Sequence, residues 1–509
     1  MDTVIDEAGP RRLIGRASIV AAGTVYRQCV SFISGLIVAR VIGAADYGIF
    51  NLARNLVDVT GIFTRLGLDL GIQRYFGESN TARDGASRTV MLRRVRLLTC
   101  TLALLPVLAV ALGLGRFLEA NVYQYSRFAE VLLCLALALP FMTDIGILGG
   151  AYRGILKLSP SVIAECVLLP TIRLAVILIL FMAGWRLWAV VVGTTLGSFL
   201  ASAFLAMRAR SDFARGVSPP PQPWSNVFRV VSYSSVLAGS MIVTSLTMSM
   251  DTLTIGYFMT AQDLGQYSLV KTLVVLTGVF GAACGQGLEA LVADRYFRGD
   301  LDGMVHVMSV TARLIAMVTV PIFAIFLFWG AQITHLFGPS FVTSQAVVSW
   351  LAAGPFVAMI FWPSATALSM TGKHFLELKI LSVGLVIGTL LCWFAVPEFG
   401  QLGAAAAMCT SVVFANVARV LFVRRSIGAF PFRSDIFLIT AAGIGLAWGS
   451  RLVVAQFALP SIWNIVCGVG CFVLAYGVAG WMHLLSESER SGIHGAVKST
   501  AAMLFSKRN

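Results

Sequence analysis

Long apolar segments of about 20 residues recur along almost the whole chain and are separated by short polar segments. A segment of that length can cross a bilayer as a helix. The sequence therefore predicts an all-α polytopic membrane protein with about fourteen spans. We expect these spans near residues 17–42, 46–72, 97–115, 128–150, 161–183, 187–207, 227–256, 264–292, 305–329, 344–370, 375–396, 401–423, 435–457 and 461–485.

One apolar stretch, residues 46–76, differs from the others because it carries Arg54, Asp58, Arg65 and Asp69. On one continuous helix these four charges would share a sector of roughly 60° and extend over about 22 Å of its length. A charge at bilayer depth costs about 2.5–3.5 kcal/mol, so this face has to meet protein or a water-filled cavity. It is either one wall of a polar pathway or an ion-pair seam between residues four apart.

The composition agrees with a membrane protein, since 58% of the residues are hydrophobic and 12% are charged. Soluble domains carry about 25% charged residues. With a cytoplasmic N-terminus, the cytoplasmic segments hold 25 of the 38 Lys and Arg residues and the external loops hold three. This asymmetry is the one that inner-membrane proteins show. It predicts a protein of the cytoplasmic membrane with both termini in the cytoplasm, and it explains the net charge of +14 without nucleic acid.

The sequence offers little support for catalysis or for a bound cofactor. The five histidines are scattered, the nine cysteines form no CxxC motif, and no P-loop is present. The N-terminus lacks the layout of a cleaved signal peptide. The longest external loop, near residues 115–127, is too short for a catalytic domain. We therefore expect a protein that is not an enzyme and has no cofactor and no metal.

An internal repeat organises the spans. The segment beginning at Ala44, AADYGIFNLAR, returns at Ala261 as AQDLGQYSLVK, at a constant spacing of 217 residues. The repeat predicts two pseudo-symmetric lobes of six helices each. Because six is an even number, both copies have the same orientation, with an axis along the membrane normal. The predicted parts are a cytoplasmic N-terminus at 1–16, an N-lobe at 17–207, a cytoplasmic Pro-rich linker at 208–226, a C-lobe at 227–424, two extra spans within 435–485, and a cytoplasmic tail at 486–509.

The repeat aligns Arg54 with Lys271. Two cations at equivalent depths of pseudo-symmetric helices would face each other across the cleft between the lobes, where transporters bind substrate. In the alternative arrangement, Lys271 pairs with a nearby acid such as Asp251.

The segments that carry the repeat resemble the polysaccharide and O-antigen flippases. These are Wzx-type members of the multidrug/oligosaccharidyl-lipid/polysaccharide (MOP) exporter superfamily. The resemblance rests on a G-x-x-x-Y-G-x-F turn at residues 43–50 and on an L-G-L-x-x-x-x-x-R-Y run at residues 66–75. A second segment, 249–273, is also similar, and the resemblance covers roughly residues 15–425.

The resemblance implies a two-lobed transporter that alternates between two openings and moves undecaprenyl-diphosphate-linked sugar units across the membrane. The diphosphate requires cations while it crosses a low-dielectric barrier. Matching the basic positions of relatives gives Arg27, Arg54 and Lys271 as substrate-binding residues, and Arg65 is added from the charged face. We expect Asp58, Asp69 and Asp251 to set the resting charge or to take part in ion coupling. Expected partners are the lipid-linked glycan, membrane lipid, and polysaccharide polymerase or assembly proteins.

Three other functions remain open. A peptidoglycan-precursor flippase would share the fold and a cationic cavity. A multidrug exporter of this fold is disfavoured because acids should then dominate the cleft. A membrane glycan polymerase or ligase would normally require a large external loop.

Overall fold

The computed structural model describes residues 10–78, 85–213, 225–275, 277–278, 288–427, 432, 434–457, 460–480 and 482. These residues form helices joined by short turns, and no strand occurs among them. The predicted fold class, an all-α membrane protein, is confirmed. The predicted tail at 486–509, the first nine residues and residues 214–224 of the predicted linker lie outside the described part of the chain.

The first half of the chain forms one helical bundle. Its helices are α2 (Pro10–Arg65), α3 (Leu68–Glu78), α4 (Gly85–Ala109), α5 (Gly115–Leu118), α6 (Phe128–Ala136), α7 (Leu139–Gly154), α8 (Leu158–Val162), α9 (Leu169–Met182) and α10 (Leu187–Phe213). Three π-helical segments, η2 (Val110–Leu114), η3 (Glu119–Tyr123) and η4 (Ile163–Leu168), interrupt them. Helix α10 continues past residue 208, where the linker was expected to begin.

The second half forms another bundle. Its helices are α11 (Ser225–Phe258), α12 (Ala261–Val274), α14 (Leu288–Phe297), α15 (Leu301–His335), α16 (Gln345–Ile360), α17 (Trp362–Met370), α18 (His374–Phe399), α19 (Gln401–Ile427), α20 (Asp435–Ala455) and α21 (Ser461–Ala479). The last two helices, expected as an appendage, pack on α15. The Arg451 guanidinium on α20 donates a hydrogen bond to the carbonyl oxygen of Phe328 at 2.6 Å.

Ten helices in the described part of the chain are long and apolar enough to cross a membrane, or eleven when the bent pair α16 and α17 counts as one span. The chain is thus a multi-pass membrane protein, but fourteen spans are not established. The predicted span 17–42 and most of the predicted span 46–72 are the two arms of α2, which kinks at Gly43 (φ 82°, ψ 172°), and the end of the second span belongs to α3. The predicted span 264–292 includes residues outside those that the structure describes.

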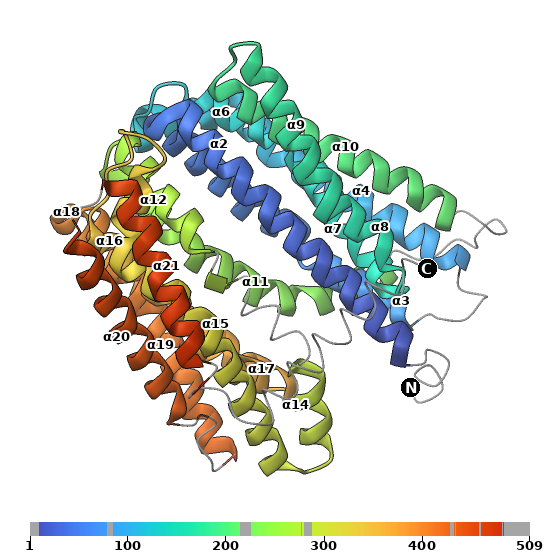
Figure 1. Cartoon of the computed structure of the whole chain (residues 1–509). Coiled ribbons are helices and arrows are strands. Elements are labelled where there is room, and N and C mark those ends of the chain that lie inside the picture. The colour runs from blue at the N-terminus through green and yellow to red at the C-terminus, as the bar shows by residue number, and fades with distance from the viewer. Residues whose placement is uncertain are drawn as a thin grey trace, which may run out of the picture.

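The two bundles lie at an angle and meet where α2 and α12 run side by side (Figure 1). We call this end, which carries Gly43, residues 119–127 and Thr260, the kink end. The opposite end, which carries Pro10, α3 and the start of α11, is the linker end. One continuous apolar cluster crosses both bundles at the kink end and includes Phe50, Tyr267 and Phe341.

The repeat positions meet each other at the kink end. A Cβ atom on Gly48 would lie 2.1 Å from the carbonyl oxygen of Ala261, and one on Gly265 would lie 1.7 Å from that of Ala44. Only glycine permits backbones to approach this closely. The spacing of 217 residues that separates Gly48 from Gly265 also separates Ala44 from Ala261. The contact of Gly48 with Ala261 is therefore the symmetry equivalent of the contact of Gly265 with Ala44. This is expected if the pseudo-twofold axis of the repeat passes between the two contacts.

The prediction of one unbroken helix over residues 46–76 is wrong. Helix α2 ends at Arg65, and Leu66 (φ 50°) and Gly67 (φ 67°) both adopt the left-handed conformation before α3 begins. This region favours glycine and is rare for leucine. A Cβ on Gly67 would lie 2.6 Å from the carbonyl oxygen of Ser234, so the break also lets α11 pack closely on the first bundle at the linker end.

Candidate functional site

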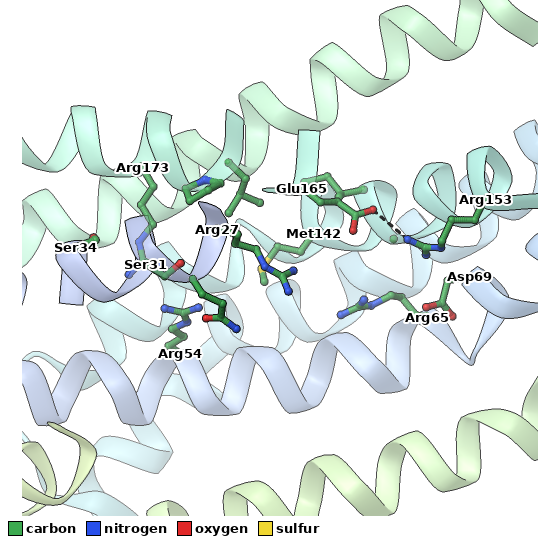
Figure 2. Close-up of a pocket in the computed structure, with 15 residues that line it drawn as sticks. Arg27, Ser31, Ser34, Arg54, Arg65, Asp69, Met142, Arg153, Glu165 and Arg173 are labelled. Carbon is green, nitrogen blue, oxygen red and sulfur yellow. Dashed lines mark hydrogen bonds and ion pairs between the residues drawn. The ribbon is translucent and has the colours of Figure 1, made fainter. Parts of the chain in front are cut away.

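A cavity of about 500 Å³ lies within the first bundle and is lined mainly by polar and charged side chains. Helices α2, α7 and α9, the segment η4 and the start of α3 form its walls. Five arginines and two carboxylates line it, which gives an excess of three positive charges. These residues are Arg27, Arg54, Arg65, Arg153, Arg173, Asp69 and Glu165. We call this space the arginine cavity (Figure 2).

The kink in α2 brings three of these arginines together from two arms of one helix. Arg27 lies on the arm before Gly43, whereas Arg54 and Arg65 lie on the arm after it. Figure 2 shows their side chains entering the same space from the two arms. Because the chain reverses at Gly43, residues far apart in α2 can contact one ligand.

Helices α7 and α9 contribute the opposite wall. Arg153 lies in the last turn of α7, and Arg173 lies on α9. Glu165 belongs to the π-helical segment η4, a type of helix that is frequent at functional sites. Arg153 and Glu165 form an ion pair with N–O distance 3.4 Å (Figure 2).

Two glycines of α7 leave room for the charged groups. A Cβ on Gly149 would lie 2.2 Å from Oε1 of Glu165, and one on Gly146 would lie 3.1 Å from Cδ of Arg65. The sequence GILGG of α7 thus leaves space where larger residues would displace Glu165 or press on Arg65.

The arginines that α2 contributes to the arginine cavity are only partly neutralised by protein groups. Arg54 forms an ion pair with Asp58 at 3.5 Å, with 39% and 44% of the two side chains exposed. Arg65 donates through Nε to the carbonyl oxygen of Gly61 at 3.1 Å. The predicted seam between Arg65 and Asp69 is not formed in the described structure, because the break at Leu66 and Gly67 separates the two residues.

Three buried polar atoms of residues that line the arginine cavity have no hydrogen-bond partner within the described residues. They are Oγ of Ser34, Oδ1 of Asp69 and Nε of Arg173. Leaving a buried polar group without a partner costs about 1–3 kcal/mol. Such groups are explained most simply by water or by a ligand in the cavity.

A second cavity, of about 450 Å³, adjoins the first and lies between the bundles. Gln28, Ser31, Arg54 and Arg173 line both cavities. The other polar lining residues are mostly uncharged amides and hydroxyls from α2, α11 and α12. They are Asn51, Asn55, Tyr47, Ser245, Ser249 and Thr272, and Asp58 adds one acid. We call this space the amide cavity.

Lys271 does not line either cavity. Its Nζ donates to Oδ1 of Asp251 at 2.6 Å and to the hydroxyl of Thr252 at 3.0 Å. Asp251 is fully buried, and its other oxygen accepts a hydrogen bond from Tyr267 at 2.7 Å. The arrangement is the alternative expected for Lys271, namely pairing with Asp251. This pairing does not test the prediction that Lys271 binds cargo.

Of the seven predicted site residues, the structure brings Arg27, Arg54, Arg65 and Asp69 to one cavity and places Asp58 in the adjoining one. Lys271 and Asp251 pair elsewhere. Sequence reasoning missed Arg153, Glu165 and Arg173 as site residues. For Glu165 and Arg173 a signal existed, since an isolated ionisable residue in a membrane span is a functional candidate by default.

Comparison with known families agrees with this architecture. A family model described as polysaccharide biosynthesis protein matches residues 15–286, which is more than half of the chain. A MatE family model matches residues 237–394. No curated protein sequence matches the chain.

Solved structures share the fold at low identity. A structure of the lipid II flippase MurJ in an inward closed conformation is 12% identical with a TM-score of 0.72, covering 91% of this chain and 98% of that chain. An inward-facing multidrug resistance MATE family transporter of the MOP superfamily is 12% identical with a TM-score of 0.66, covering 81% and 98%. An outward-facing structure of such a transporter is 15% identical with a TM-score of 0.56, covering 83% and 96%.

Proposed function

Because the chain belongs to the polysaccharide biosynthesis protein family, we propose that it is a flippase for undecaprenyl-diphosphate-linked oligosaccharides. It moves the sugar-bearing head of this lipid from the cytoplasmic to the external leaflet of the bacterial inner membrane, by alternating access between two lobes. Under the orientation that the charge distribution favours, the linker end faces the cytoplasm and the kink end faces outward.

The arginine cavity is the observation that carries this proposal. Its five arginines exceed its two carboxylates by three charges, so it favours an anionic ligand. Arginine suits a diphosphate in particular, because its planar guanidinium forms two parallel hydrogen bonds to phosphate oxygens. The unpartnered Nε of Arg173 supplies a donor that a phosphate oxygen can satisfy.

The adjoining amide cavity provides a place for the sugars. Hydroxyl-rich ligands need both donors and acceptors, and amide and hydroxyl side chains supply both. With the diphosphate at Arg54 and Arg173, which line both cavities, the first sugars would lie against Asn51 and Asn55. We assign Arg27 and Arg65 to the diphosphate as well.

The acids have a separate proposed role. Asp58 and Asp69 lie among the arginines, and Oδ1 of Asp69 is buried without a hydrogen-bond partner among the described residues. A proton or metal cation that neutralised either acid would strengthen anion binding, so both are candidates for coupling transport to an ion gradient.

A second candidate cargo is the peptidoglycan lipid precursor. The fold likeness to the lipid II flippase MurJ, at a TM-score of 0.72, favours it. Both cargoes carry a diphosphate, so the arginine cavity fits either, and they differ in the attached head group.

The proposal is tested by transport in proteoliposomes that contain the full chain. Undecaprenyl-diphosphate oligosaccharide isolated from the host bacterium is placed in the membrane, and its appearance in the opposite leaflet is followed with an impermeant sugar-oxidising reagent. We expect wild type to move this lipid and Arg54→Gln to move it at least about tenfold more slowly, since a charged hydrogen bond contributes about 1.5–3 kcal/mol.

Two outcomes would contradict the proposal. If the lipid moves between leaflets at the same rate in vesicles with wild type and in protein-free vesicles, the chain does not transport it. Faster movement of the peptidoglycan precursor than of the oligosaccharide lipid, measured in the same vesicles, would favour the second cargo.

A further inference from the structure

A third cavity, of about 530 Å³, lies at the kink end, away from the arginine cavity. It is formed by the segment 121–125 of the first bundle and by the turn 257–261 between α11 and α12. The two sides are joined by a hydrogen bond of 2.7 Å from the Tyr125 hydroxyl to the carbonyl oxygen of Met259. Burial and the nearby Asp263 raise the pKa of Tyr125, which keeps this hydroxyl protonated as a donor.

Exposed aromatic rings form one wall of this cavity. Tyr257 and Phe258 line it and are 46% and 36% exposed. Both pack on Trp393 of α18, whose ring stacks on Tyr257 at a centroid distance of 5.6 Å and meets Phe258 edge-on at 5.0 Å. The packing against Trp393 holds the two rings as a fixed platform.

Amide groups form the facing wall. Asn121 donates to the carbonyl oxygen of Phe117, which leaves its own amide oxygen available as an acceptor. The side chain of Gln124 is exposed and forms no hydrogen bond to the described residues. Among the described residues, no charged side chain lines the cavity. Its chemistry is therefore aromatic and amide, in contrast to that of the arginine cavity.

The segment is also held in an unfavourable backbone conformation. Gln124 (φ 53°, ψ 31°) and Arg127 (φ 68°, ψ 3°) are both left-handed although neither is glycine. Such residues cost about 1–3 kcal/mol each and concentrate at functional sites. The conformation turns Tyr123 and Tyr125 inward, where both are buried, and leaves Gln124 outside.

We propose that this cavity is a binding site for the neutral sugar residues of a glycan. A sugar ring has apolar C–H faces, which pack on aromatic rings, and a rim of hydroxyls, which pair with amides. The absence of charged lining residues favours sugars over phosphate. That the glycan is the head of the transported lipid rests on the proposed function, under which the kink end receives cargo on the external side.

The alternative for exposed Tyr and Trp residues is the aromatic belt of a membrane protein at the lipid interface. A belt explains the rings of Tyr257 and Trp393. It does not explain a concave site with two amides opposite the rings, nor the strained Gln124.

The test uses the full chain in nanodiscs and a phosphate-free oligosaccharide, released by mild acid from the host's lipid-linked pool. Calorimetry gives its dissociation constant. We expect wild type to bind, and Tyr257→Ala and Gln124→Gly to bind at least about tenfold more weakly. Gln124→Gly removes the amide and relieves the left-handed strain, so a loss of binding would not come from added backbone strain. Phe394→Ala, which removes a 71% exposed ring outside the cavity, is the matched control and should bind as wild type does.

Arg54→Gln distinguishes this site from the arginine cavity. It should retain the phosphate-free oligosaccharide and lose the diphosphate lipid. Sugar binding with no binding of the diphosphate lipid to wild type would leave this site standing and overturn the proposed cargo. The site itself is overturned if the oligosaccharide binds Tyr257→Ala and Gln124→Gly as tightly as wild type, or does not bind wild type. The fluorescence of Trp393 gives a further control. If spin-labelled lipids at the interface quench it strongly, and adding the oligosaccharide does not reduce this quenching, the rings belong to the aromatic belt.

Discussion

Arg54 and Lys271 occupy equivalent positions in the two copies of the repeat, yet their surroundings differ. Arg54 lines both the arginine and the amide cavity, and its one ion pair within the described part of the chain is a half-exposed pair with Asp58 at 3.5 Å. Lys271 lines neither cavity and is held at 2.6 Å by a fully buried Asp251. One cation is available to a ligand, and the other is neutralised within its own bundle.

The difference can be traced to one further position of the repeat. The spacing of 217 residues aligns Asp251 with Ser34. In the second bundle, this position supplies the carboxylate that neutralises Lys271. In the first bundle it supplies a buried hydroxyl, on the wall of the arginine cavity, that has no hydrogen-bond partner in the part of the chain that the structure describes. We infer that the two copies diverged by assigning one cation to the cargo and the other to the fold.

The largest expected effect is on stability, from Lys271→Met. Removing one partner of a buried pair leaves a charge without compensation and costs about 3–5 kcal/mol. We expect a marked decrease in the temperature at which the purified protein unfolds, measured by loss of the folded peak in size-exclusion chromatography.

The matched control removes both charges. Asp251→Asn combined with Lys271→Met should recover most of the lost stability, because no buried charge remains. A single Lys271→Met variant as stable as wild type would show that the pair does not stabilise the fold, and the contrast with Arg54 would fail.

A smaller effect is expected on binding, from Ser34→Asp. This substitution gives Arg54 the acid that Lys271 already has, so the first bundle is made to resemble the second. Neutralising one cation should weaken binding of undecaprenyl diphosphate by about tenfold, which corresponds to about 1.4 kcal/mol. Ser34→Asn has the same size without the charge and should bind much more tightly than Ser34→Asp. If the two variants bind undecaprenyl diphosphate equally, neutralisation of Arg54 does not explain the weaker binding of Ser34→Asp.

The smallest effect is expected from Asp58→Asn, which removes the partner of Arg54. An exposed ion pair contributes only about 0–1 kcal/mol, so stability should hardly change. Binding of undecaprenyl diphosphate should become about two- to threefold tighter, since the guanidinium no longer has a competing carboxylate. Calorimetric titration with undecaprenyl diphosphate measures this change in affinity. Weaker binding by Asp58→Asn would mean that Asp58 orients Arg54 for the ligand.

The helical class followed from sequence periodicity, because apolar segments of about 20 residues identify spans without knowledge of their packing. The 217-residue repeat was also found in the sequence. That the two copies touch at Gly48 and Gly265 was not predicted, because an internal repeat shows which positions are equivalent and not which of them are in contact.

The break at Leu66 and Gly67 was not predicted, although glycine stood at the position. Glycine is common inside membrane helices and does not by itself end one. The left-handed backbone there accompanies the close approach of Ser234 on α11, a contact between residues more than 160 positions apart. Periodicity cannot report such a contact, and so Asp69 was placed on the wrong helix.

The other residues of the arginine cavity were not predicted as site residues for a similar reason. Arg153, Glu165 and Arg173 lie on three different elements, and their spacing matches no motif. Only the packing of α7, η4 and α9 against α2 makes them neighbours of Arg27 and Arg54. For Lys271 the sequence left two arrangements open, because the distance to Asp251 depends on how α11 and α12 pack.

The most direct test of the contrast is the affinity for an undecaprenyl-diphosphate oligosaccharide, measured at low and high salt for two variants side by side. We expect Arg54→Gln to bind at least about tenfold more weakly than wild type, with a smaller difference at high salt, where charges are screened. We expect the Asp251→Asn/Lys271→Met double variant to bind within about twofold of wild type. Unchanged affinity for Arg54→Gln, together with a large loss for the folded double variant, would contradict the assignment of the cargo to Arg54 and assign it to the second bundle.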